Sequence, residues 1–208
     1  MMTTSPDVAD PREWALPSAI LATGNEGKRR EFADALSGLF STLQRLPERM
    51  VMPPETGSSF RENALVKAQF VCEQTGCPAL ADDSGLAVDA LDGAPGIYSA
   101  RFAGPGATDA ENCAKLLRAL ADTNHREAMF VCELALVYPD GRMVFVRGEC
   151  RGLIAFSPAG DGGFGYDPLF YYPPSARTFA ELTLLEKAAI SHRGRALAEL
   201  RRQLVAQT

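Results

Sequence analysis

The sequence predicts an α/β fold built on a mixed β-sheet flanked by helices. Strand-like and helix-like segments alternate from residue 18 to about residue 122, and two β-rich runs then surround Pro139-Asp140-Gly141, which is a hairpin signal. The last segment, 181–207, has a mostly helical pattern. Alternation favours parallel strand pairing and a hairpin adds antiparallel strands, so we expect both kinds of pairing in one sheet.

The composition indicates a folded chain with one main domain. Of the 208 residues, 46% are hydrophobic and 23% are charged, which is ordinary for a globular protein. We expect a single domain over residues 18–208, because a chain of this length can bury one sizeable core. Residues 1–17 are polar, interrupted by prolines and without hydrophobic periodicity, so we predict a flexible N-terminal extension.

Charge and cysteine content exclude several classes of function. A net charge of -5 argues against broad nucleic-acid binding, which depends on Lys and Arg neutralising phosphates. The five cysteines include no C-x-x-C pair and are accompanied by only two histidines, so we expect no zinc site. Scattered cysteines in odd number indicate free thiols in a reducing compartment. Since no signal peptide or membrane-spanning stretch is evident, we predict a cytoplasmic protein without membrane contact.

The first predicted unit is a strand, a glycine turn and a helix. Residues 18–23 form a short apolar run, and residues 26–40 carry apolar side chains at helical spacing. Backbone N–H groups of the turn between them could hold a phosphate, with Lys28 reaching the same anion. The turn is not a P-loop, because Gly24 and Gly27 are too close together. A tight turn with a solvated lysine is the alternative interpretation.

The second predicted helix covers residues 59–75. Ser59 and Glu62 have the spacing of a capping box, and Gly76 is placed to end the helix in a left-handed conformation. Asn63 and Lys67 are four residues apart and therefore share a face. They could point at one ligand beyond the preceding loop, or the face could simply be solvated.

Residues 79–104 combine a buried-strand pattern with an unusual number of carboxylates. Successive side chains on a strand point to opposite faces, so one of Asp82 and Asp83 should enter a cleft while the other orients a neighbour. Carboxylates are ligands that Mg²⁺ prefers, and Gly85 would let a phosphate approach the backbone. A simple turn over residues 82–85 is the alternative, although the strand pattern resumes at once in residues 86–91.

The second half of the chain contains one further capped helix and a loop rich in glycine, proline and aromatic residues. Thr108 and Glu111 again have capping-box spacing. Residues 157–176 are too long and too patterned for a plain connector, so we predict a functional loop. Its "GGFGYDP" segment could present an aromatic ring for base stacking, or the ring could anchor the loop itself. Ser191 is placed to cap a last helix.

Five motifs in this order resemble one known family. They are "LATGNEGKRREF", "SFRENALVKA", "ALADDSGLAVDALDGAPGIYSARFAG", "GGFGYDPLF" and "ELTLLEKAAISHRGRAL". Together they resemble the dITP/XTP/ITP diphosphatase family of purine nucleoside triphosphate pyrophosphatases, from about residue 18 to the end. The resemblance implies an elongated, two-lobed α/β fold with a nucleotide cleft between the lobes, and a homodimer. It also implies Mg²⁺-dependent cleavage of the triphosphate to monophosphate and pyrophosphate.

The resemblance assigns roles by matching position. Asp83 corresponds to the general base and a metal ligand, supported by Asp82, and Glu55 corresponds to a metal-binding glutamate. Pro54, directly before Glu55, departs from relatives that are acidic there. Lys67 corresponds to a phosphate-region lysine with a catalytic role. The residues implied to bind the substrate are Thr23, Gly24, Asn25, Glu26, Gly27, Lys28, Ser84, Phe164, Gly165, Tyr166, Asp167, Lys187, His192 and Arg193.

The implied mechanism is in-line attack by water at the α-phosphorus, with Asp83 as the base. Lys28, Lys67 and Lys187 would neutralise charge growing on pyrophosphate. Donors from His192, Arg193 or nearby backbone N–H groups would pair with the 6-oxo group of hypoxanthine or xanthine. Two alternatives stay open: a related pyrophosphatase with a preference for other modified nucleotides, and a non-catalytic nucleotide-binding or RNA-associated module.

Overall fold

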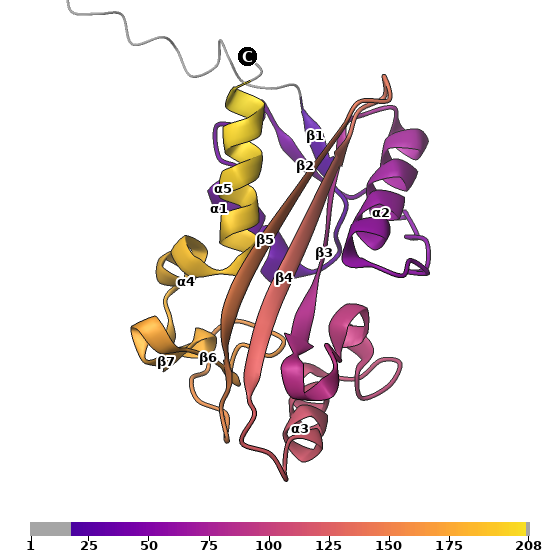
Figure 1. Ribbon diagram of the computed structural model, residues 1–208. Helices are drawn as coiled ribbons and strands as arrows, with labels where there is room; N and C mark the ends of the chain where they lie inside the picture. The colour runs from indigo at the N-terminus through magenta and orange to yellow at the C-terminus, as the bar shows by residue number, and fades with distance from the viewer. Residues whose placement is uncertain (1–17, 207–208) are drawn as a thin grey trace, which may run out of the picture.

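Seven strands and five α-helices make up the described part of the computed structural model, residues 18–206 (Figure 1). The strands are β1 (Ala19–Leu21), β2 (Leu43–Arg45), β3 (Ala79–Val88), β4 (Glu127–Val137), β5 (Met143–Ile154), β6 (Phe170–Tyr172) and β7 (Arg177–Thr178). The α-helices are α1 (Glu26–Ala35), α2 (Phe60–Thr75), α3 (Asp109–Ala119), α4 (Leu184–Ile190) and α5 (His192–Val205). Short 3₁₀ turns are η1 (Asp89–Leu91), η2 (Gly96–Arg101), η3 (Pro173–Ser175) and η4 (Phe179–Glu181). The predicted extension, residues 1–17, lies outside the described residues.

The strands form one mixed sheet in the order β2-β1-β3-β4-β5-β6-β7. β1 pairs in parallel with β2 and β3, and every other pairing is antiparallel. The prediction of an α/β fold with a mixed sheet is therefore confirmed. The predicted hairpin is also present, since β4 and β5 pair along their whole length around the turn at residues 138–142.

The three long strands β3, β4 and β5 run the length of the molecule and carry different elements at their two ends (Figure 1). At one end, here called the upper lobe, α1 and α5 cover one face of the sheet and α2 covers the other. At the opposite end, the lower lobe, lie η2, α3, β6, β7 and the loop of residues 155–169. The elongated, two-lobed shape that the resemblance implied is thus the observed one.

Side-chain alternation along β3 divides the core between the sheet faces. Leu80 packs with apolar residues of α1 and α5, whereas Ala79 and Ala81 pack with residues of α2. Leu86 and Val88, further along the strand, belong to the core of the lower lobe. A strand with this alternation must place Asp82 toward α1 and α5, and Asp83 toward α2.

Helix ends follow the sequence signals closely. Gly76 adopts φ 66° and ends α2, and Thr108 and Glu111 form a complete capping box on α3, as predicted. At α2 the prediction of a capping box was only half right. The Ser59 hydroxyl accepts from the Glu62 N–H, but the Glu62 carboxylate accepts from the backbone and hydroxyl of Ser58 instead of closing the box.

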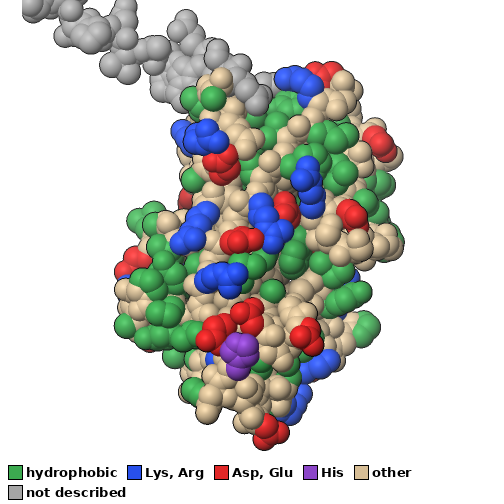
Figure 2. All heavy atoms as spheres, viewed as in Figure 1, with side chains coloured by type: hydrophobic (Ala, Val, Ile, Leu, Met, Phe, Trp, Pro, Cys, Tyr) green, Lys and Arg blue, Asp and Glu red, His purple; other side chains and the backbone are tan. Residues whose placement is uncertain are grey.

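Two further features bear on the sequence predictions. All five cysteines are free thiols, and no helix of residues 18–206 has the length and apolarity needed to cross a membrane. On the face viewed in Figure 2, Lys and Arg side chains alternate with Asp and Glu side chains and form no patch of one sign. On the long hairpin, for example, Arg147 contacts both Glu133 and Glu149.

Candidate active site

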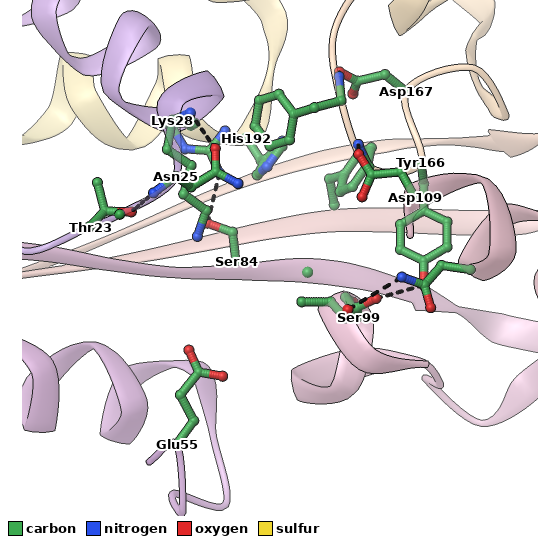
Figure 3. A pocket seen from close by; sticks show the side chains of 18 of the residues that line it. Thr23, Asn25, Lys28, Glu55, Ser84, Ser99, Asp109, Tyr166, Asp167 and His192 are labelled. Atoms are coloured by element: carbon green, nitrogen blue, oxygen red, sulfur yellow. Dashed lines mark hydrogen bonds between the residues drawn. The ribbon is translucent and has the colours of Figure 1, made fainter. Parts of the chain in front are cut away.

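A pocket of about 440 Å³ lies between the two lobes (Figure 3). Its walls come from the turn after β1, the loop before α2, the middle of β3, η2, α3, the 155–169 loop and the start of α5. Predicted site residues that line it are Thr23, Gly24, Asn25, Lys28, Glu55, Lys67, Ser84, Phe164, Gly165, Tyr166, Asp167, Lys187, His192 and Arg193. Predicted site residues outside the lining are Glu26, Gly27, Asp82 and Asp83. The structure therefore gathers most of the predicted residues around one cavity.

The turn after β1 forms one wall and leads directly into α1. The Asn25 side chain accepts from the Lys28 N–H at 2.9 Å and caps the helix, while the Thr23 hydroxyl accepts from the Asn25 N–H at 3.2 Å. These bonds fix the turn with the helix N-terminus toward the pocket, which is the arrangement that favours an anion. Glu26 faces away from the pocket and pairs with Arg29.

Asp82 is buried in a network of cations behind this wall. Its Oδ2 atom lies 2.9 Å from Lys28 Nζ and 3.4 Å from Arg193 Nη2, and it accepts from the Ser84 hydroxyl at 2.7 Å. Burial opposes ionisation, but the charges of Lys28 and Arg193 hold the pKa of Asp82 below its usual value. Asp82 is thus a buried anion that positions two pocket-lining cations through Oδ2, whereas its Oδ1 is buried without a hydrogen-bond partner within residues 18–206.

Asp83 lies on the opposite face of β3 and belongs to a second cluster. Its Oδ1 accepts from Lys67 Nζ at 3.0 Å and its Oδ2 from the Asn63 amide at 3.1 Å. Lys67 Nζ also donates to Glu55 Oε1 at 3.0 Å, and Arg101 Nη1 donates to Glu55 Oε2 at 2.9 Å. Asn63 and Lys67 do share one helix face, and the group on which they converge is Asp83.

Burial and the charges in this cluster shift the pKa values of Asp83 and Lys67. Burial and the neighbouring Glu55 carboxylate raise the pKa of Asp83, although Lys67 acts in the opposite direction. Burial would lower the pKa of Lys67, but Asp83, Asp82 and Glu55 raise it overall, so the ammonium stays charged. A carboxylate with a raised pKa next to a fixed cation is a reasonable proton acceptor.

The Glu55 and Asp83 pair fits a divalent cation. Both carboxylates already approach a single cationic atom, Lys67 Nζ, and two carboxylates completed by water and phosphate oxygens are a usual Mg²⁺ environment. Within residues 18–206 no group of three or more His, Cys, Asp or Glu side chains is arranged to hold a metal. The donor set suits an ion that the substrate helps to bind.

The opposite end of the pocket is formed by the 155–169 loop and α5. The Phe164 ring packs on Gly27, where an added Cβ would come within 2.6 Å of it, and Lys187 Nζ lies 4.8 Å from the ring centroid. Tyr166 instead is buried in the lower core, with its hydroxyl donating to the Ser99 carbonyl at 2.8 Å. Of the two aromatic residues, Phe164 is the one suited to stacking, and Tyr166 anchors the loop.

Lys187 and Arg193 are buried and share a carboxylate partner that the sequence analysis did not single out. Glu31 accepts from Lys187 Nζ at 2.9 Å and also binds Arg193. Lys187 donates to Asp167 at 2.5 Å as well, which places its ammonium beside the loop and not in the cluster of Lys67 and Asp83. The structure therefore places Lys187 away from the cluster of Lys67 and Asp83, and its contact with the phosphates stays a prediction.

His192 is buried and stacks on Phe130, with ring centroids 4.6 Å apart. Burial and the nearby charges of Arg193 and Lys187 lower the pKa of His192 well below its usual value, so the imidazole is neutral. In residues 18–206, its Nδ1 atom and the Nε atom of Arg193 are buried without a hydrogen-bond partner. By contrast, the Phe164 and Gly165 N–H groups already donate to the carboxylates of Asp167 and Asp109.

Gly85 makes a close approach to η2, while its predicted role of letting a phosphate approach the backbone stays a prediction. An added Cβ would lie 2.5 Å from the Gly96 carbonyl oxygen and 2.5 Å from the Ser99 hydroxyl. The close approach at this position is therefore made by η2 packing on β3, although Gly85 also lines the pocket.

Three residues of the site were missed by sequence reasoning. Glu31 lies on the same helix as Lys28, but its partners Lys187 and Arg193 are on α4 and α5, so no local spacing indicates its role. Arg101 and Asp109 are brought to the pocket only by the folding of η2 and α3 against the sheet, so no local pattern marks them.

Comparisons with known proteins agree with this geometry. A model of the Ham1 family matches residues 19–203. The chain is 50% identical over 186 residues to a protein named dITP/XTP pyrophosphatase from Syntrophobacter fumaroxidans, covering 88% of this chain and 80% of the relative. It is 52% identical over 184 residues to a protein of the same name from Thermus thermophilus, covering 87% and 88%.

Solved structures share the fold. A HAM1 protein from Coxiella burnetii superposes with a TM-score of 0.83 at 44% identity, covering 92% of this chain and all of that one. A Mycobacterium abscessus protein described as a nucleoside-triphosphatase / dITP/XTP pyrophosphatase gives a TM-score of 0.71 at 48% identity, covering 88% and 97%. Because the family model spans nearly all of the described residues and close relatives cover most of the chain, the chain belongs to the Ham1 family.

Proposed function

We propose that this chain hydrolyses dITP and XTP, and ITP by the same chemistry, to the nucleoside monophosphate and pyrophosphate. One observation carries the proposal. One pocket is lined by Glu55 and Lys67 at one end, where Lys67 contacts Asp83, and by Phe164 and α5 at the other, in a chain about half identical to proteins named dITP/XTP pyrophosphatase. Hydrolysis of a nucleoside triphosphate would use both ends, with the charged cluster at the triphosphate and Phe164 with α5 at the base.

The proposed chemistry uses Asp83 as the base. A water molecule attacks the α-phosphorus and passes its proton to Asp83, while the bond from the α-phosphorus to the bridging oxygen breaks and pyrophosphate leaves. The raised pKa of Asp83, caused first by burial and then by Glu55, improves its match to this role. Lys28 and Lys67 line the pocket and would neutralise the charge that develops on pyrophosphate.

We propose Mg²⁺ as the cofactor, held by Glu55 and Asp83. When bound, the ion would supply positive charge against the phosphate oxygens and help to orient them. Lys67, which contacts both carboxylates, would then turn from Glu55 toward the phosphates, while Arg101 continues to hold Glu55. Asp82 would support this site indirectly, because it lies on the opposite face of β3 from Asp83 and holds Lys28 and Arg193.

Selectivity for 6-oxo purines is proposed to depend on α5. His192 and Arg193 line the pocket, and His192 Nδ1 and Arg193 Nε are buried there without hydrogen-bond partners within residues 18–206, whereas the Phe164 and Gly165 N–H groups are already engaged. A site that leaves a buried polar group unpaired with the wrong base can discriminate by as much as ~10⁴. This supports recognition of hypoxanthine and xanthine by side chains of α5 and not by the loop backbone.

The cellular role that we propose is removal of these nucleotides before they enter DNA or RNA. A cytoplasmic location would suit this role, and the five free thiols are compatible with a reducing compartment. We also propose a homodimer, which light scattering of the purified protein would test by its mass relative to the 22.4 kDa chain.

The function is tested by a substrate panel on the purified protein. Pyrophosphate release from dITP, XTP, ITP, UTP and ATP would be measured with Mg²⁺ and with EDTA. We expect turnover of the first three only, and only with Mg²⁺. Preferred cleavage of UTP or another modified nucleotide would indicate a related pyrophosphatase, and binding without turnover would indicate a non-catalytic module.

A further inference from the structure

The loop that carries Phe164 is attached to α3 through the main chain of one residue. The Gly165 N–H donates to Asp109 Oδ2 at 2.6 Å, and the Cys113 thiol donates to the Gly165 carbonyl at 3.4 Å. Burial, with the charges of Asp109 and Asp167, raises the pKa of Cys113 to about 11, so the thiol keeps the proton that it donates. Both polar groups of this glycine are therefore held by the same helix.

Gly165 separates the two aromatic residues of the loop, so its position decides where both rings lie. Phe164 points to Gly27 of α1 and Tyr166 to Ser99 of η2. The chain turns between them with φ 63° at Gly165, a conformation that glycine adopts readily but that nothing in the glycine itself enforces. The Phe164 N–H and the Tyr166 hydroxyl hold the residues on either side, and the bonds from α3 act on Gly165 itself.

Asp109 is well suited to hold Gly165 in place. It is the first residue of α3, where the helix dipole favours a carboxylate, and within residues 18–206 it takes part in no ion pair. Its charge is thus free to strengthen the bond to the Gly165 N–H, since hydrogen bonds to ionised acceptors are shorter and stronger than neutral ones. The 2.6 Å distance agrees with such a bond.

We propose that Asp109 is a positioning residue for nucleobase binding, which acts by fixing the main chain at Gly165 and so placing Phe164 against the base. This inference rests on the proposed function for its substrate. Because stacking holds the base equally before and during the reaction, loss of the positioning should weaken nucleotide binding and raise KM while leaving kcat nearly unchanged.

The test compares Asp109→Ala with Asp109→Asn, whose amide oxygen can still accept from the Gly165 N–H. Glu111→Gln is the matched control, because it removes a negative charge from the same helix turn but has no contact with the loop. Urea unfolding confirms that each variant is folded. The first readout is amide hydrogen exchange at Gly165 by NMR without substrate. We expect about tenfold faster exchange in Asp109→Ala, and rates within about threefold of wild type in the other two.

The second readout is equilibrium binding of inosine 5′-monophosphate, which carries the base and needs no turnover. The dissociation constant should rise about tenfold in Asp109→Ala and stay within about threefold in Asp109→Asn and Glu111→Gln, with KM for dITP following the same order. A decrease in kcat alongside the increase in KM of Asp109→Ala would contradict the proposal.

Three further results would overturn the inference. They are unchanged Gly165 exchange in Asp109→Ala, faster exchange without weaker binding of the monophosphate, and binding lost equally in Asp109→Asn and Asp109→Ala. The last would show that the charge meets the substrate directly. If wild type fails to hydrolyse dITP and XTP, the proposed function fails, whereas exchange and monophosphate binding still decide the role of Asp109.

Discussion

Asp82 and Asp83 are neighbours in sequence but have opposite environments. Strand alternation alone predicts that they face different sides of the sheet, and the structure shows what each side contains. Asp82 faces Lys28 and Arg193 in a closed network, and Asp83 faces Lys67 and Asn63 at the edge of the pocket. Removing the two charges should therefore have different effects.

Asp83→Asn should abolish most activity while the fold remains. The amide has the shape of the carboxylate but cannot accept the proton from water, so we expect kcat for dITP to fall by at least about 100-fold. Pyrophosphate release measures the effect, and urea unfolding checks the fold. Near-normal turnover by a folded Asp83→Asn protein would remove Asp83 from the mechanism.

Asp82→Asn should mainly affect stability. The change leaves buried Arg193 and half-buried Lys28 next to each other without their shared carboxylate, which we expect to lower the free energy of unfolding by about 3 kcal/mol. Urea unfolding of Asp82→Asn beside wild type gives the comparison. Equal stability of Asp82→Asn and wild type would show that the buried network contributes little.

At the residue scale, the sequence predicts which residues take part in the chemistry better than it predicts which residues they contact. Lys28 and Lys67 could be nominated from a turn and a helix face, and Asp83 from the alternation of side chains along a strand. The carboxylate that holds Lys187 and Arg193 could not, since Glu31 reaches Lys187 across 156 positions of sequence. Such long-range pairing is a property of packing, and local spacing contains no information about it.

At the scale of elements, one serine links the last two helices. The Ser191 N–H donates to the Lys187 carbonyl at the end of α4, and its hydroxyl accepts from the Gly194 N–H at the start of α5. His192 and Arg193 follow directly, so this cap fixes the entry of α5 into the site.

Ser191→Ala should lower stability by about 1 kcal/mol, because the Gly194 N–H loses its acceptor. It should also raise KM for dITP, because the uncapped first turn of α5 contains His192 and Arg193, which line the pocket. Ser191→Thr keeps the hydroxyl and is the matched control. Urea unfolding and steady-state kinetics measure the two effects, and a Ser191→Ala protein as stable as Ser191→Thr would contradict the role of the cap.

Elements with strong local signals were the predictable ones. The caps of α3 and α5, the left-handed end of α2 and the β4–β5 turn all follow from a few adjacent residues. β2, β6 and β7 contain only two or three residues, and β6 falls inside a segment predicted to be a loop. Strands this short exist because a neighbouring strand offers hydrogen bonds, which the sequence of the segment does not reveal.

At the scale of the whole molecule, the buried neutral His192 should make stability depend on pH. In the unfolded chain the imidazole takes up a proton as the pH falls through about 6.5, whereas in the folded protein its pKa is well below that value. The unfolded state thus binds more protons below this pH. The free energy of unfolding should decrease as the pH falls, by about 1.4 kcal/mol per pH unit at most.

Urea unfolding at about pH 7.5 and about pH 5.5 measures this dependence. We expect the decrease in stability to be smaller by about 1 kcal/mol in His192→Gln than in wild type. The other histidine, His125, is exposed, so His125→Gln is the control and should behave like wild type. An equal decrease in all three proteins would show that His192 is not kept neutral by the fold.

The three long strands have a consequence for how the molecule could be divided. β3, β4 and β5 pass from the upper lobe into the lower lobe as single hydrogen-bonded ladders, with the pocket beside their middle. A cut between the lobes would sever both ladders, and each fragment would keep only part of every strand. The two ends of the molecule therefore share one cooperative framework, and neither lobe can be cut out as an independent folding unit.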